Sequence, residues 1–189
     1  MQDLFNDIRG CTKCPLYLTR LNAVPASVGK NYNVGGLMVI AEAPGQDEDK
    51  QGVPLVGRAG TLFNAVLNGA MMSRDDIVVT NRVRCRPPRN RLDDHPEALL
   101  QCDEWTQKEL AEYQPSVVVL MGNTAMRMAY GATAKITATR GKPRKTKEGI
   151  VFVPTWHPSA VLRNGGTSSS MYAQSVSDFQ LAREFIETE

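Results

Sequence analysis

The sequence lacks a long apolar run, a leader segment and a phosphate-binding loop, and each absence argues against a class of protein. No stretch approaches the roughly 20 apolar residues of a membrane-spanning helix. The N-terminal residues mix acids with one Arg and have no hydrophobic segment, so they do not resemble a signal peptide. A G-x4-G-K-S/T loop is missing too, which argues against a nucleotide hydrolase. We therefore expect a cytoplasmic protein without membrane attachment.

Strong net charge is also absent, because the formal net charge is only +2 over 189 residues. Attraction to a polyanion must then come from local clusters. Two loops are basic: residues 82–91 contain five Arg, and residues 140–147 contain five Lys or Arg. They can neutralise phosphates along one face, or they are simply solvated loops. The length and the 42% hydrophobic content predict a single domain over residues 1–189, and we expect a monomer.

Four short apolar runs predict buried strands at residues 36–41, 77–80, 117–122 and 150–154. Helical spacing is present at residues 61–72, 96–113, 123–131 and 173–187, with Asp93 or Asp94 expected to cap the second helix. Strands that alternate with helices predict an α/β fold with a parallel sheet covered on both faces. Ligands bind beyond the carboxyl ends of such strands. The residues there are 42–45, 81 onward, 122–123 and 155–159.

The chain has four cysteines, Cys11, Cys14, Cys85 and Cys102, of which the first two form a C-x2-C pair. Disulfides are disfavoured in the cytosol, whereas four thiolates suit a structural zinc or an iron–sulfur cluster. A zinc ribbon usually has a second C-x2-C pair, which is missing here. The wide spacing of Cys85 and Cys102 therefore favours a cluster that joins separate segments. The alternative for Cys102 is a thiol buried in the core.

Five motifs occur in order along nearly the whole chain. They are C-T-K-C at 11–14, A-E-A-P-G-Q-D-E-D at 41–49, G-V-P-L-V-G-R-A-G at 52–60, N-R-V-R-C-R-P-P-R-N-R at 81–91 and T-W-H-P-S at 155–159. With these motifs the chain resembles family 4 uracil-DNA glycosylases, the iron–sulfur branch of that superfamily. The resemblance implies a three-layer α/β/α sandwich around a four-stranded parallel sheet. It also implies a [4Fe-4S] cluster, held by the four cysteines, with a structural role.

The implied activity is monofunctional excision of uracil from single- or double-stranded DNA, which leaves an abasic site. The enzyme must flip the nucleotide out of the stack and stabilise a departing uracil anion. His157 is the candidate donor to uracil O2. The amide of Asn81 can match both N3–H and O4 of uracil and so reject cytosine, although an Asn here can also simply form a turn.

The other candidate residues follow from the family's motifs. Glu42 positions or activates the attacking water, and Glu48 orients His157 or assists the water. Asn90 is a further polar residue in or beside the site. Substrate binding is also expected from Ala43 and Leu55. Contacts with DNA are expected from Arg86, Arg89, Ser159, Leu162 and Arg163, with Leu162 filling the gap left by the flipped base.

One position departs from the family. Leu55 stands where the family typically has Phe, whose ring stacks on uracil, and stacking on an aromatic ring is worth about 1–3 kcal/mol. Leucine keeps an apolar wall but is smaller. Either uracil excision is slower, or the pocket prefers a 5-substituted uracil such as 5-hydroxymethyluracil. Residues 136–147 contain no His, which argues against a covalent link to DNA.

Two other classes compete with the enzyme. A non-catalytic iron–sulfur DNA-binding module would explain the cysteines and basic loops, but it does not need Glu42, Asn81 and His157 at three strand ends. A redox protein would need a cluster that cycles at accessible potentials, and nothing in the sequence separates the two kinds of cluster. The glycosylase is the prediction that accounts for all these residues.

Overall fold

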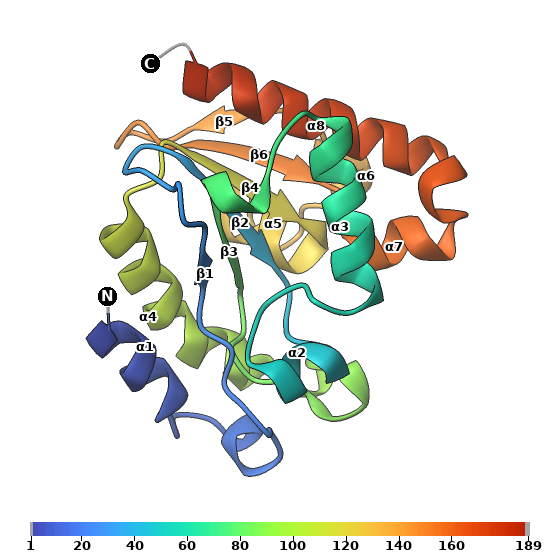
Figure 1. The fold of residues 1–189 in the computed structure, drawn as a ribbon. Helices are drawn as coiled ribbons and strands as arrows, with labels where there is room; N and C mark the ends of the chain where they lie inside the picture. The colour runs from blue at the N-terminus through green and yellow to red at the C-terminus, as the bar shows by residue number, and fades with distance from the viewer. Residues whose placement is uncertain (1, 188–189) are drawn as a thin grey trace.

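The computed structural model describes residues 2–187, which form a central sheet with helices on both faces (Figure 1). Four parallel strands make its centre: β2 (Leu37–Ala41), β3 (Ile77–Asn81), β4 (Val117–Met121) and β6 (Val151–Thr155). Two-residue strands pair antiparallel at the edges, β1 (Ser27–Val28) with β3 and β5 (Arg144–Lys145) with β6. The order is β1-β3-β2-β4-β6-β5.

The predicted α/β/α sandwich is confirmed, but the sheet has six strands rather than four. The four central strands are found because each is a buried, β-branched run on which both faces are covered. The edge strands escape prediction because each is only two residues long and neither is buried. Pairing with a neighbour, not an apolar pattern, defines them.

The α-helices surround the sheet. They are α1 (Gln2–Arg9), α2 (Gln46–Gln51), α3 (Arg58–Gly69), α4 (Pro96–Tyr113), α5 (Gly122–Tyr130), α6 (Ile136–Thr139), α7 (Pro158–Arg163) and α8 (Ser170–Glu187). Short 3-10 helices are η1 (Pro15–Leu18), η2 (Arg74–Asp76), η3 (Pro88–Asn90), η4 (Leu92–Asp94) and η5 (Gly166–Ser168). No helix within residues 2–187 has the length and hydropathy of a membrane span.

Alternate residues of each central strand enter different cores, as the two-residue period of a strand requires. On β2, Leu37 and Val39 pack with α3 and α8, whereas Met38 and Ile40 pack on the opposite face with α4, α5 and α6. Phe63 of α3 and Phe179 of α8 meet with ring centroids 5.9 Å apart. The helices thus hold the sheet rigid and leave its carboxyl edge for the site.

A third, smaller core lies beside the sheet and joins α1, η1 and the first half of α4. It contains all four cysteines together with Trp105. In Figure 1 α1 and α4 lie next to each other at the blue and yellow-green end of the molecule. The N-terminal segment is therefore packed on the cysteine-bearing part of the chain.

Several helix boundaries differ from the predictions. The helix predicted at 61–72 is α3, which begins earlier and ends at Gly69. The predicted caps of α4 are wrong: Asp93 and Asp94 lie in η4, and His95 occupies the N-cap without a side-chain hydrogen bond. Pro96 at the first helical position starts the helix, because its missing N–H needs no partner there.

Candidate active site

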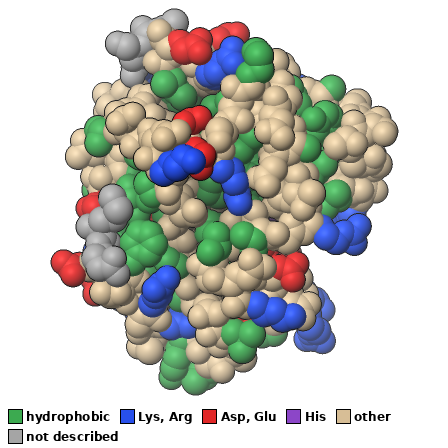
Figure 2. Space-filling view, viewed as in Figure 1, with side chains coloured by type: hydrophobic (Ala, Val, Ile, Leu, Met, Phe, Trp, Pro, Cys, Tyr) green, Lys and Arg blue, Asp and Glu red, His purple; other side chains and the backbone are tan. Residues whose placement is uncertain are grey.

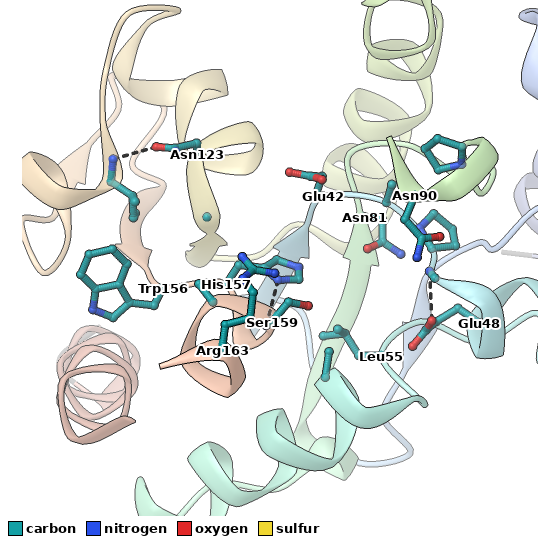
Figure 3. Close-up of a pocket in the computed structure, with 18 residues that line it drawn as sticks. Glu42, Glu48, Leu55, Asn81, Asn90, Asn123, Trp156, His157, Ser159 and Arg163 are labelled. Carbon is teal, nitrogen blue, oxygen red and sulfur yellow. Dashed lines mark hydrogen bonds between the residues drawn. The ribbon is translucent and has the colours of Figure 1, made fainter. Parts of the chain in front are cut away.

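A pocket of about 420 Å³ opens at the carboxyl ends of the parallel strands, where the sequence predicts a site (Figure 3). Each of β2, β3, β4 and β6 contributes residues at or just beyond its end, and α7 closes one side. The predicted residues that line the pocket are Glu42, Ala43, Glu48, Leu55, Asn81, Asn90, His157, Ser159 and Arg163. The fold therefore brings residues from four of the five sequence motifs, together with Arg163 of α7, into one cavity.

His157 is the N-cap of α7, directly after β6. Its Nδ1 accepts a hydrogen bond from the backbone N–H of Ser159 at 3.2 Å. Burial lowers the pKa of His157, and this outweighs the nearby charge of Glu42, which acts to raise the pKa. A neutral imidazole with Nδ1 as acceptor carries its proton on Nε2. The ring is thus prepared to donate from Nε2.

Asn81 ends β3 and is 2% exposed. Its side-chain Nδ2 is buried and has no hydrogen-bond partner within residues 2–187. A buried polar group without a partner costs free energy, and such groups are rare unless a ligand or water meets them. The backbone carbonyl of Asn81, in contrast, accepts a hydrogen bond from Nη1 of Arg84. The backbone is held while the amide is left free to meet a ligand in the pocket.

Arg84 is itself held by a buried ion pair. Its Nη2 lies 2.7 Å from Oε2 of Glu109, and the two side chains are 1% and 0% exposed. Nη2 also donates to the Thr106 hydroxyl at 3.3 Å. Helix α4 therefore determines where the Asn81 carbonyl lies.

The two carboxylates of the pocket have different surroundings. Glu42 follows β2 and accepts one hydrogen bond, from the Thr124 hydroxyl to Oε2 at 2.6 Å. Glu48 accepts three from the backbone: Gly45 N–H to Oε2 at 3.0 Å, and the N–H groups of Val56 and Gly57 to Oε1, each at 2.9 Å. Glu48 thus ties α2 to the loop that carries Leu55, whereas Glu42 has hydrogen-bonding capacity left for a ligand.

Leu55 forms an apolar wall and is 5% exposed. Its φ is 54°, a left-handed conformation that is uncommon for residues other than glycine. The Leu55 carbonyl lies so close to Gly60 that a Cβ there would be 1.9 Å from the oxygen. Only glycine at position 60 allows α3 to pass the strained loop, so the G-V-P-L-V-G-R-A-G motif is a packing requirement of the pocket wall.

Three predicted DNA contacts lie outside the pocket. Nε of Arg86 donates to Oδ1 of Asn90 at 2.8 Å, and Arg89 is exposed with a φ of 55°. Leu162 lines a separate groove of about 400 Å³ between α3 and α7. These residues surround the site rather than form it.

The basic loop at 82–91 is largely neutralised within the protein. Arg82 pairs with Asp103 at 2.7 Å, Arg84 pairs with Glu109, and Arg91 lies 3.2 Å from Asp94. On the face drawn in Figure 2, Lys and Arg side chains are dispersed among Asp and Glu and do not form a continuous patch. The cluster seen in the sequence is therefore mainly structural, apart from Arg86 and Arg89.

The pocket residues without a predicted role are Pro44, Gly45, Ala59, Pro87, Gly122, Asn123, Ile136, Trp156 and Ala160. The rule for strand ends does point to Gly122, Asn123 and Trp156, because they follow β4 and β6. Ile136 has no such signal, since α6 is a four-residue helix far from any strand end in the sequence.

The four cysteines lie around one small pocket and form no disulfide. Cys14, Cys85 and Cys102 are buried. Nη1 of Arg20 lies 3.1 Å from the Cys85 sulfur, and Nε1 of Trp105 lies 3.3 Å from the Cys11 sulfur. Within residues 2–187 no group of three or more His, Cys, Asp or Glu side chains has the arrangement to hold a single metal ion.

Comparison with known proteins agrees with the fold and the pocket. A family model described as the uracil DNA glycosylase superfamily matches residues 31–180. The match spans all four central strands and every residue of the pocket. The first two cysteines lie outside it.

Curated relatives are more specific. The type-4 uracil-DNA glycosylase of Thermotoga maritima is 35% identical over 190 residues, covering 100% of this chain and 96% of the relative. That of Sulfurisphaera tokodaii is 35% identical and covers 87% of this chain and 76% of the relative. That of Archaeoglobus fulgidus is 32% identical, with 86% and 83% covered. The chain belongs to the type-4 family of the uracil DNA glycosylase superfamily, as its motifs predict.

Proposed function

We propose that the protein hydrolyses the N-glycosidic bond between uracil and deoxyribose in DNA and leaves an abasic site for base excision repair. The observation that carries the proposal is that one pocket is lined both by Asn81, whose buried Nδ2 has no hydrogen-bond partner among residues 2–187, and by His157, whose pKa burial lowers so that the ring is neutral. Two directional donors that face a cavity suit a ligand with fixed acceptor positions, and uracil has O2 and O4.

The bond to be broken leaves negative charge on uracil, and this charge develops near O2. His157 donates from Nε2 to O2, because its Nδ1 already accepts from Ser159 N–H. A donor aimed at developing charge in a site with little water is worth far more than the same donor in solution. Keeping the ring neutral matters too, because it fixes which nitrogen donates.

Base identity is read by Asn81. Nδ2 donates to uracil O4 and Oδ1 accepts from N3–H, whereas cytosine presents the reversed pattern. A mismatched base would leave the buried Nδ2 without a partner, which costs about 1–3 kcal/mol. Leu55 encloses the ring with apolar surface but supplies no aromatic stacking.

Glu42 positions the attacking water on the sugar. Thr124 holds one carboxylate oxygen, which leaves the other available to accept from water. The carboxylate also favours positive character on the deoxyribose as the bond breaks. Glu48 has the backbone of the Leu55 loop as its partner and so maintains the shape of the pocket.

A matched set of variants tests this assignment. Oligonucleotides with one U, T, C or hypoxanthine are incubated with protein and treated with alkali to open abasic sites. Wild type should cut at U, and His157→Ala and Asn81→Ala should each lose about 10²–10³-fold in rate. The controls are His95→Ala at the start of α4 and Asn68→Ala, exposed on α3, and neither should change cleavage. Unchanged cleavage in His157→Ala and Asn81→Ala would contradict the assigned site.

We further propose that the four cysteines hold a [4Fe-4S] cluster. The donor set fits: four thiols surround one pocket, and the N–H groups of Arg20 and Trp105 lie at two of the sulfurs, where they stabilise thiolates. Burial raises the pKa of the Cys85 thiol to about 11, so ionisation there depends on a bound metal. The cluster would join α1 and η1 to α4.

The cluster is tested by iron and sulfide analysis of purified protein. Cys85→Ala should lose iron and thermal stability together, whereas His157→Ala should keep both. A Cys85→Ala protein with full iron content would contradict the cluster assignment.

A further inference from the structure

The pocket extends past His157 on the side away from Asn81 and Leu55. In Figure 3 Trp156 and Asn123 lie on one side of His157, and Leu55, Asn81 and Glu48 lie on the other. Ile136 completes this second part, which we call the Trp156 lobe (Asn123, Ile136 and Trp156). Recognition of one pyrimidine ring uses only the Asn81 side, so the mechanism above leaves the lobe without a role.

The lobe is fixed in place by contacts outside the cavity. Nε1 of Trp156 donates to Oε1 of Gln174 on α8 at 2.7 Å, so the polar edge of the indole is already occupied. The Ile136 backbone N–H donates to Oδ1 of Asn123 at 2.8 Å and joins α6 to α5. What the lobe offers to the cavity is therefore a pre-positioned aromatic and aliphatic surface.

The segment that leads into the lobe is tied down as well. Arg140, just after α6, pairs with Asp178 at 2.6 Å, and Thr155 donates to the same carboxylate at 2.7 Å. Asp178 is 2% exposed. The residues before and after the lobe thus share one buried anchor on α8, and the lobe does not need to form on binding.

We propose that the Trp156 lobe is a subsite for the nucleotide next to the flipped uridine, whose base stacks on the Trp156 ring. The proposal rests on the proposed function. With uracil against Asn81 and its glycosidic bond at His157, the polymer continues past His157 toward the lobe. Every base has an apolar face that stacks on an aromatic side chain, whatever the sequence. Arg163, which also lines the pocket, is a cation suited to the phosphate between the two nucleotides.

Two variants isolate the aromatic face. Trp156→Phe and Trp156→Leu both lose the hydrogen bond to Gln174 and both keep apolar bulk, but only Phe can stack. Single-turnover cleavage is measured on three single-stranded oligonucleotides with one U: natural neighbours, a tetrahydrofuran abasic residue on the 5′ side, and the same residue on the 3′ side. Melting temperatures of both variants establish that they are folded.

Wild type should lose about 5- to 150-fold in rate on one of the two abasic-neighbour substrates, since stacking is lost there. Trp156→Leu should show a similar loss relative to Trp156→Phe on the natural substrate. On the sensitive abasic-neighbour substrate the two variants should cleave equally, because no base is present to stack.

Equal losses of Trp156→Leu on all three substrates would mean that Trp156 only supports the fold, and would overturn the subsite. Wild-type rates that do not depend on either neighbour would overturn it too. In both cases cleavage at U persists, so the proposed function stands. Absence of wild-type cleavage at U in every substrate would instead overturn the proposed function and the subsite together.

Discussion

Glu42 and Glu48 line the same pocket, and their surroundings predict opposite consequences of mutation. Glu48→Ala removes the acceptor for three backbone N–H groups, those of Gly45, Val56 and Gly57. A buried donor without an acceptor costs about 1–3 kcal/mol. Because water can enter the open pocket and accept from some of these N–H groups, we expect about 1 kcal/mol for each of the three, or a loss of about 3 kcal/mol in the free energy of unfolding. At about 2–4 °C per kcal/mol, the melting temperature should fall by about 6–12 °C.

Glu42→Gln should behave in the opposite way. The amide oxygen can still accept from Thr124, so the melting temperature should stay within about 2 °C of wild type, as expected for a change of less than 0.5 kcal/mol. The rate of cleavage at U should fall by about 10²–10⁴-fold, which is the usual contribution of a positioned acid or base to the rate. In Glu48→Gln one oxygen still accepts from Val56 and Gly57, so cleavage should remain within about tenfold of wild type.

The assay is differential scanning fluorimetry together with single-turnover cleavage, measured at least about 15 °C below the lowest melting temperature, a margin larger than the expected shift of about 6–12 °C. A Glu48→Gln protein as stable as wild type but without activity would contradict these roles, because it would make Glu48 the catalytic carboxylate. So would a Glu42→Gln protein that cleaves normally.

Two further predictions concern pH and the buried ion pair. Because burial lowers the pKa of His157, the unfolded chain takes up a proton below its usual pKa of about 6.5 while the folded protein does not. Thermal stability should therefore fall as the pH drops below about 6.5. The fall should be smaller in His157→Gln than in wild type, whereas His95→Gln should follow wild type. An equal dependence of the melting temperature on pH in wild type and His157→Gln would contradict this prediction. Arg84→Met leaves the buried Glu109 with only the Ala26 N–H donating to it, so it should cost about 3–5 kcal/mol, seen as a lower urea midpoint, and Arg84→Met with Glu109→Leu should recover part of the loss. An Arg84→Met protein with the urea midpoint of wild type would argue against the burial of the ion pair.

The central sheet and the main helices could be predicted because their residues repeat with the period of the element. Strands β2, β3, β4 and β6 are continuous apolar runs, and α4 has a proline at its first position. Helices α1, α2, α6 and α7 could not, since each has eight or fewer residues. Helix α2 is mostly acid and amide residues, and tertiary contacts through Glu48 decide its conformation.

The pocket was partly predictable for a related reason. Parallel strands end at one edge, so residues that follow them, such as Glu42, Asn81 and His157, must lie near one another. The division of labour between the two carboxylates could not be predicted, because it depends on which backbone N–H groups the 53–57 loop presents to Glu48. The left-handed backbone conformation of Leu55 could not be predicted either, because the only residue related to it in the sequence is Gly60, which the Leu55 carbonyl approaches closely.

The stretch from Asn81 to Cys85 has a consequence for how this chain can change by mutation. Asn81 faces the pocket and Cys85 faces the other cysteines, while Val83 and Arg84 between them are 0% and 1% exposed. Arg84 holds the Asn81 carbonyl with its side chain and lies beside Cys102 through its backbone N–H. A substitution in this stretch therefore affects base recognition and the cysteine site together. New substrate preferences should arise more readily through the Leu55 loop, in which Pro54, Val56 and Gly57 make their hydrogen bonds through backbone groups and not through side chains.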